Sequence, residues 1–390
     1  MRSTTDNVVP LGDRWRTHMT RGLRSLEQGD HEGAQQHFAE AHRLAPERAE
    51  TCAALGREHL RRGQIEEAEP LLRKACSHDP ELLSAVAALS RLLGLGRGKL
   101  GEAHALLDEA LIRHADEPAL LLVKGELYLE GDRIPEARAV FERALDLGGD
   151  AEAAKAGLAR TCNAEGITLS EGGNDEQALF WFKRAADLDG AWAGPHVNLG
   201  VVFARLGKGA RAREEYDRAI DLDPSNPVAF FNLGNLCRVE GENDAAVRAY
   251  SRVIELAPEY PHVRGAMADA LGELGEFERA IELFREELVR DPDSLSCWGN
   301  LGLAYACKGD EKQAEECLRR SLAIDPDYFN ACCNLAALLA TQGRHPEACE
   351  LLEKAHKLDP ERARLWFKRD EKFAAWRADP RFSFLIEEKT

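Results

Sequence analysis

The sequence lacks a long apolar run, and this absence excludes a membrane-spanning helix. Its longest runs, Leu120–Val123 and Leu335–Ala340, are far shorter than the roughly 20 residues needed to cross a bilayer. Residues 1–11 also lack the continuous apolar core and the small-residue cleavage site of a secretion signal. We therefore expect neither membrane insertion nor export, and we predict a cytoplasmic protein.

The sequence also lacks a surplus of basic residues. It has 68 acidic against 51 basic residues, which gives a formal net charge of −17. Binding to a phosphate backbone needs clustered Lys and Arg, so nucleic acid is not an expected partner. The acidic surface suits plain solubility, with attraction of a basic protein segment as the alternative.

Metal-binding patterns are missing as well. None of the ten cysteines forms a C-x-x-C pair, and the twelve histidines include no H-E-x-x-H. The scattered cysteines fit neither a zinc site nor a small disulfide scaffold, and buried free thiols in a reducing compartment explain them. We expect no metal and no other cofactor.

What the sequence does contain is an internal repeat with a period of about 34 residues. One alanine recurs ten times at this period, except that one step is longer by a single residue and another is longer by seven. The copies are Ala34, Ala68, Ala103, Ala137, Ala178, Ala212, Ala246, Ala280, Ala314 and Ala348. A fixed period of this length predicts a solenoid of stacked supersecondary units.

Each unit has the same internal order. A glycine stands five residues before the alanine in nine units, and in the fourth unit Gly131 comes one residue earlier. Glycine at this point takes the left-handed conformation that ends one helix and reverses the chain. A small residue usually follows the alanine by seven positions, and in most units a proline comes five positions later. Each unit therefore reads as helix, Gly turn, helix and Pro.

The segment Ala193–Pro224 carries the fullest signature. It contains Asn198-Leu199-Gly200, followed by Phe203, Gly207, Ala212, Tyr216, Ala219 and Pro224. This pattern resembles the tetratricopeptide repeat family, and the resemblance extends over roughly residues 15–362. It implies an all-α, right-handed superhelical solenoid of about ten helix–turn–helix repeats that serves protein–protein interaction.

Departures from the period define the expected domain organisation. The longest step, from Ala137 to Ala178, predicts two extra helical turns in the first helix of repeat five, within 151–169. We divide the chain into a tail (1–14), repeats one to four (15–150), repeats five to ten (151–362), and a capping helix and tail (363–390). The capping helix is predicted over Glu361–Ala378, because a terminal repeat needs a polar cover, and residues 1–12 are expected to fray.

Two motifs imitate ligand sites. Residues 96–101 match G-x-G-x-x-G, but a dinucleotide fingerprint follows a strand, and Ser84–Leu93 reads as a helix. Residues 221–226 imitate the start of a calcium loop but lack glycine at the sixth position and carry the proline between units. The repeats account for nearly all of the chain, so we predict that the protein is not an enzyme.

The candidate binding residues lie on the first helices of the later repeats, which line the concave side of such a solenoid. Four asparagines share one position there, and Ala266 interrupts the row; these amides either pair with an extended peptide or serve the scaffold. The candidate peptide-binding residues are Asn198, Val201, Phe231, Asn232, Asn235, Asn300, Leu303 and Asn334. Some members of the family hold a C-terminal carboxylate with Lys and Asn, but Phe231 stands where that Lys is expected.

The predicted function is therefore a non-catalytic scaffold or adaptor that binds a peptide or helix of a partner protein in the concave groove. A self-assembling structural scaffold and a regulatory subunit that acts on an enzyme in trans are the alternatives.

Overall fold

In the computed structural model, the described residues are 13–378, 382, 385 and 386, and they contain helices and turns but no strand. The chain forms two compact units that divide between Pro195 and His196. We call them unit 1 and unit 2 and describe each by itself. The division at 150/151 that we drew from the repeat pattern stays a prediction.

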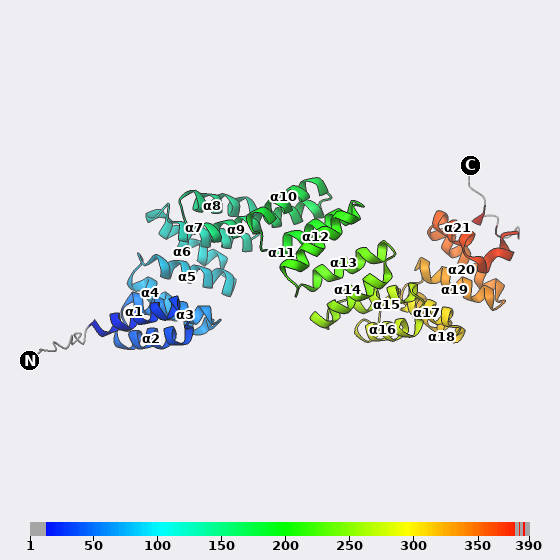
Figure 1. The fold of residues 1–390 in the computed structure, drawn as a ribbon, viewed down its shortest axis with the longest axis horizontal. Coiled ribbons are helices and arrows are strands. Elements are labelled where there is room, and N and C mark those ends of the chain that lie inside the picture. The colour runs from blue at the N-terminus through cyan, green and yellow to red at the C-terminus, as the bar shows by residue number, and fades with distance from the viewer. Residues whose placement is uncertain (1–12, 379–381, 383–384, 387–390) are drawn as a thin grey trace, which may run out of the picture. The chain divides into compact units, whose positions relative to one another are not determined.

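Unit 1 is a stack of five antiparallel helix pairs (Figure 1). The first helices of these pairs are α1 (Arg14–Glu27), α3 (Ala49–Arg61), α5 (Leu83–Arg91), α7 (Pro118–Glu130) and α9 (Ala151–Glu171). The second helices are α2 (His31–Leu44), α4 (Ile65–His78), α6 (Leu100–Arg113), α8 (Ile134–Asp146) and α10 (Asp175–Leu188).

Unit 2 repeats this arrangement, and its leading helix α11 begins just before the division. The first helices are α11 (Ala193–Arg205), α13 (Pro227–Val239), α15 (Val263–Glu273), α17 (Leu295–Lys308) and α19 (Phe329–Thr341). The second helices are α12 (Gly209–Leu222), α14 (Asn243–Leu256), α16 (Phe277–Arg290), α18 (Glu311–Ile324) and α20 (His345–Leu358). The predicted all-α solenoid of ten helix pairs is confirmed.

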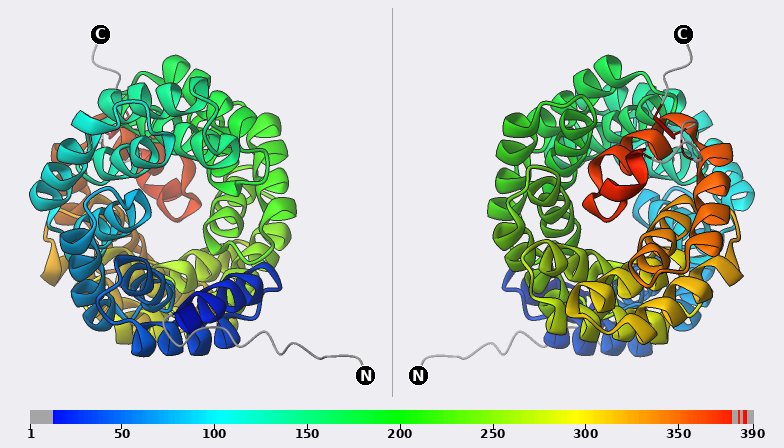
Figure 2. Two further views of the ribbon diagram at one scale, coloured as in Figure 1. Left: turned by 90° about the vertical axis from the view of Figure 1, so that its left-hand side faces the viewer. Right: turned by 90° about the vertical axis from the view of Figure 1, so that its right-hand side faces the viewer.

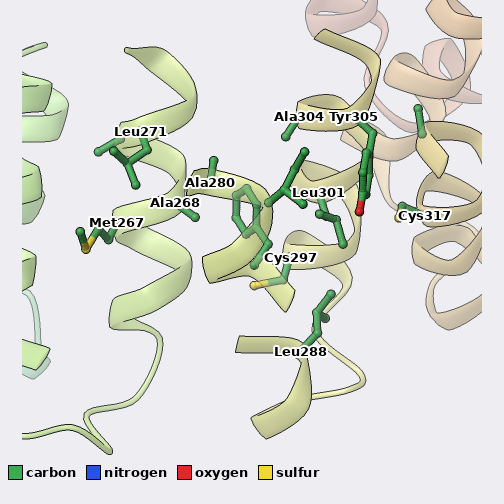
Figure 3. Close-up of a cluster of buried hydrophobic side chains, with 14 of the residues drawn as sticks. Met267, Ala268, Leu271, Ala280, Leu288, Cys297, Leu301, Ala304, Tyr305 and Cys317 are labelled. Atoms are coloured by element: carbon green, nitrogen blue, oxygen red, sulfur yellow. The ribbon is translucent and has the colours of Figure 1, made fainter. Parts of the chain in front are cut away.

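The recurring alanine holds the two helices of each pair together. All ten copies are completely buried, and each is the fourth residue or close to it in a second helix. A larger side chain there would force the helices apart, at about 1–3 kcal/mol for overpacking. Between pairs, Figure 3 shows how the core of unit 2 runs on from α15 through α17, with Leu271, Leu301 and Tyr305 among the buried side chains.

The turn inside each pair uses a left-handed residue, as predicted, and in nine pairs it is the recurring glycine. The fourth pair corrects the expectation for Gly131. There Gly131 has φ −87° and continues the helix end, while Asp132 takes the left-handed conformation with φ 55°. Aspartate tolerates this region better than most residues, because its short side chain forms local hydrogen bonds.

The two irregular steps of the repeat are absorbed inside first helices. The extra residue of repeat three is accommodated by η2 (Leu92–Gly96), a π-helical turn that follows α5. The seven extra residues of repeat five lie in α9, which is 21 residues long. Two aromatic rings pack closely against glycines of this longer helix. A Cβ added at Gly157 would lie 2.4 Å from Phe141, and one added at Gly166 would lie 2.6 Å from Phe182.

The C-terminal cap differs from the single helix predicted over Glu361–Ala378. The structure has an α-helix, α21 (Pro360–Arg369), and a 3-10 helix, η3 (Glu371–Ala378), separated by Asp370 in an extended conformation. The break lets η3 pack against α19 and α21 at the end of unit 2 (Figure 2). Phe367 and Phe373 are completely buried there, and this burial explains why the cap folds back. The tail predicted to fray, residues 1–12, lies outside the described residues.

First helices of neighbouring pairs contact one another directly, as α13 does with α15, α15 with α17, and α17 with α19. The second helices stand further apart. The first helices therefore line the inner side of each unit, which is where the candidate binding residues were expected.

Candidate functional site

Two pockets open along the inner side of unit 2. The first, which we call the acidic pocket, has a volume of about 430 Å³ and lies between α13, α15, α16 and α17. Its lining residues are Arg238, Ala268, Asp269, Gly272, Glu273, Phe277, Phe284, Asn300, Leu303, Ala304 and Cys307. It holds two carboxylates and one guanidinium group, so its net charge is negative.

The second, which we call the basic pocket, has a volume of about 570 Å³ and lies between α17, α19 and α21. Its lining residues are Asn300, Leu303, Phe329, Asn330, Cys333, Asn334, Arg362, Leu365, Trp366, Arg369 and Asp370. Two guanidinium groups face one carboxylate, and aliphatic and aromatic side chains form the rest of the wall. Its net charge is positive.

In the acidic pocket, the carboxylate of Asp269 is held by the neighbouring repeat. Nδ2 of Asn300 donates a hydrogen bond to Oδ1 of Asp269 at 2.7 Å. Burial raises the pKa of the Asp269 carboxyl above its ordinary value, while the bond from Asn300 and the charge of Arg238 oppose this shift. An aspartate in such surroundings gains from a cationic partner that compensates its lost hydration.

In the basic pocket, Arg362 is fixed in place. Its guanidinium group lies 4.4 Å from the centre of the Phe329 ring and donates to Oδ1 of Asn330 at 2.6 Å. Arg369, two helical turns further along α21, forms no hydrogen bond or ion pair with the described residues. The pocket therefore combines one positioned guanidinium group with one that has no partner among the described residues, a pattern suited to a carboxylate.

Three of the eight predicted residues meet in these pockets. Asn300 and Leu303 line both, and Asn334 lines the basic pocket. Leu303 is 39% exposed. Asn334 forms no hydrogen bond within the described part of the chain, so its amide is available to a bound segment.

Two other predicted residues contribute to the scaffold of α13. The hydroxyl of Tyr250 donates to Oδ1 of Asn235 at 2.7 Å. Phe231 is half-buried, with its ring 5.9 Å from that of Tyr250 and 5.1 Å from that of Tyr260. A cluster with these contacts positions the helix, and neither residue lines the two pockets.

The remaining predicted residues lie on the inner helices before the pockets. Asn198 and Asn232 are half-buried on α11 and α13, and Val201 is 38% exposed on α11. Asn232 forms no hydrogen bond with any described residue. The structure therefore brings the C-terminal part of the predicted set together in pockets and leaves its N-terminal part outside them.

Unit 1 also has pockets along its first helices, with volumes of about 380 and 590 Å³. Arg91 lines both and pairs with Glu126 through two bonds of 2.7 and 2.9 Å. Glu58 is buried and binds Arg61 and Arg62. Much of the charge there is neutralised within the protein, and no predicted site residue lies in these pockets.

The two motifs that imitate ligand sites are parts of the repeat. Gly96 ends the π-helical turn η2, and Gly98 is the left-handed residue before α6. Leu222 ends α12, and Asn226 caps α13 by accepting from the backbone N–H groups of Val228 and Ala229. None of the described helices is long and apolar enough to cross a membrane.

Comparison with protein families agrees with this architecture. Family models of the tetratricopeptide repeat match residues 25–93, 92–152 and 197–261. The model of the cilia and flagella-associated protein 70 middle TPR-like domain matches residues 265–367. The chain belongs to the tetratricopeptide repeat family. Tetratricopeptide repeat domains generally bind other proteins, and their fold is typical of non-catalytic proteins.

Several solved structures match this chain at low identity. Yeast Tom70 is 17% identical, covers 96% of this chain and 91% of its own, and has a TM-score of 0.41. The pilF protein of Pseudomonas aeruginosa is 21% identical, with 54% and 93% covered and a TM-score of 0.45. YrrB, a repeat protein with an unusual peptide-binding site, is 21% identical, with 46% and 92% covered and a TM-score of 0.40. The comparison with curated proteins finds no match.

Sequence reasoning missed the charged residues of the two pockets. Asp269 occupies the repeat position that Leu303 holds in the following repeat, so an alignment of the repeats contains the signal. It also lies three residues after Ala266, on the same helical face, where the row of asparagines is interrupted. Arg362 and Arg369 were missed because their segment was assigned to capping alone.

Proposed function

We propose that this tetratricopeptide repeat protein is a cytoplasmic, non-catalytic scaffold or adaptor that binds a segment of a partner protein along the inner side of unit 2. The observation that carries the proposal is the pair of pockets that meet at α17. Both are lined by Asn300 and Leu303, and together they extend from α13 to α21.

The chemistry of the pockets supports a protein ligand. Each combines apolar wall residues with a few polar groups, which is the composition of sites that bind peptides. The amide of Asn334 lines the basic pocket together with apolar Leu365 and Trp366. Such an amide has both donor and acceptor sites for the backbone of an extended segment.

The test uses one substitution in the pockets and a matched control. Leu303→Glu places a charge where both pockets meet, and Val289→Glu makes the same change on α16 at a side chain that is 82% exposed and lines neither pocket. Tagged wild type and both variants are used to capture proteins from the cells that produce this chain, and prey are quantified by mass spectrometry. Circular dichroism checks that helicity is unchanged.

The expected result is a prey that wild type and Val289→Glu retain and that Leu303→Glu loses. The same prey is then purified and its affinity measured by calorimetry, with Asn334→Ala expected to weaken it. Asn300 is unsuitable for this purpose, because its substitution also frees Asp269. A prey that binds all three proteins equally would contradict the proposal and move the site away from these pockets.

The C-terminal cap bears on the alternative of end-to-end self-assembly. Phe367 and Phe373 at the end of unit 2 are completely buried, so these two rings are not available for stacking on a second copy. This burial favours the adaptor. Sedimentation velocity over a hundredfold concentration range distinguishes the two, because an adaptor alone keeps one sedimentation coefficient.

A further inference from the structure

The acidic and basic pockets adjoin at α17, and we call the two together the trough. They share Asn300 and Leu303, which lie one helical turn apart on α17 and line both cavities. A segment that fills one pocket and continues over Leu303 therefore enters the other.

The two ends of this trough carry opposite charge. At the α15 end, Asp269 and Glu273 outnumber Arg238, and Glu273 is exposed and has no ion-pair partner among the described residues. At the α21 end, Arg362 and Arg369 outnumber Asp370. Between the charged ends, exposed Leu303 provides an apolar surface beside the amides of Asn300 and Asn334.

We infer that the trough selects a partner segment with a basic side chain at one end, an acidic side chain at the other, and apolar residues between them. The inference rests on the proposed function and specifies the partner's chemistry. The basic group pairs with Asp269 and Glu273, the acidic group with Arg369 and Arg362, and the apolar residues cover Leu303. Oppositely charged groups at fixed positions give register and orientation as well as affinity.

The geometry sets the spacing of the two charges. Three helix-to-helix steps separate α15 from α21, and packed helices lie about 8–10 Å apart, so the ends are roughly 24–30 Å apart. An extended chain advances about 3.3 Å per residue, which corresponds to about 7–9 residues between the basic and the acidic side chain. The extended form is the expected one, because the amide of Asn334 lines the pocket without a partner in the described chain.

The experiment selects binders from a library of random 16-residue peptides displayed on phage, with the whole 390-residue chain as bait. The Leu303→Glu variant serves as the counter-selection that removes peptides bound elsewhere. The expected result is enrichment of peptides with a basic and an acidic residue about 7–9 positions apart and apolar residues between them.

A charge reversal then tests the assignment of the ends. Arg369→Glu is expected to weaken the best selected peptide at least tenfold in fluorescence anisotropy, and a peptide whose acidic residue is replaced by Lys is expected to regain affinity for this variant. Arg320→Glu, on the exposed face of α18, changes the net charge equally and is expected to leave the affinity unchanged.

The outcomes separate this inference from the function on which it rests. Peptides that need Leu303 but carry no pair of opposite charges, or that ignore Arg369→Glu, overturn the inference and leave the binding function in place. A selection that yields no peptide dependent on Leu303 overturns both. Self-association that Leu303→Glu abolishes makes a second copy of this chain the occupant and overturns the inferred partner.

Discussion

Nδ2 of Asn300 lies 2.7 Å from Oδ1 of Asp269 and joins the first helices of two successive repeats, α15 and α17. Asn300 belongs to the row of asparagines that share one repeat position. Its partner Asp269 lies three residues after Ala266, in the repeat where that row is interrupted. Asn300 therefore differs from Asn334, which occupies the same repeat position but forms no hydrogen bond with a described residue.

Asn300→Ala is expected to destabilise the contact between α15 and α17. The half-buried carboxylate of Asp269 loses its hydrogen bond, and hydrogen bonds to charged groups contribute about 1.5–3 kcal/mol. Asn334→Ala is the control and is expected to change stability by less than about 0.5 kcal/mol. Hydrogen exchange of the α15 and α17 amides measures the loss locally. Equal protection in the two variants would show that the bond does not matter.

Asp269→Asn is expected to stabilise unit 2 more at pH 7 than at pH 4. Burial raises the pKa of Asp269 in the folded protein, so the unfolded chain releases this proton at lower pH than the folded chain does. Stability therefore falls as the pH rises from the ordinary pKa to the raised one, and the amide avoids this cost. Urea unfolding of wild type and variant at the two pH values measures the difference in unfolding free energy. A difference that is the same at both pH values would contradict the prediction.

Asp132→Gly is expected to stabilise unit 1 by about 0.5–1 kcal/mol. Asp132 is exposed and holds φ 55°, a conformation that costs a residue with a Cβ more than it costs glycine. The relief of backbone strain in the folded protein outweighs the entropy that glycine, with its greater freedom in the unfolded chain, loses on folding. Thermal unfolding followed by circular dichroism gives the direction of the change in stability. A lower melting temperature would mean that the aspartate side chain stabilises the turn.

The ten cysteines are expected to differ sharply in reactivity. Burial raises the pKa of the Cys333 thiol to about 12, so at pH 8 only about 10⁻⁴ of it is thiolate. Cys307 is exposed and lines the acidic pocket. Iodoacetamide is therefore expected to modify Cys307 first, and peptide mass spectrometry identifies the site. A bound segment in the trough should slow that modification, which provides a reporter independent of charge.

The sequence was sufficient to predict the helix pairs because the residues that specify each pair lie within one repeat. Its alanine, its turn glycine and its period all act within a single repeat, so ten copies in register determine ten similar pairs. The fourth turn differed because the left-handed residue keeps its distance of five residues from the alanine, so Asp132 and not Gly131 takes this conformation. The cap differed because the aromatic contacts of Phe373 were not visible in the helical pattern.

The candidate site was harder to predict than the fold. Asn300, Leu303 and Asn334 follow from their place on the first helices, and the structure puts them in pockets. The roles of Asn235 and Asn300 depend on partners 15 and 31 residues away, which no single repeat reveals. The charge of each pocket is likewise a sum over several helices, so it appears only after the repeats have been stacked.

The two irregular helices show how a repeat array tolerates changes in length. Seven residues turn an α-helix by about 700°, close to two full revolutions, so α9 presents its following residues in the original phase. One inserted residue adds about 100° and would rotate every later side chain of that helix away from its contacts. A π-turn such as η2 accommodates the extra residue locally and prevents this rotation. Whether an insertion is tolerated therefore depends first on the helical phase that it leaves and only then on its length. The inner surface can lengthen in steps of two turns while the pairing of its helices is preserved.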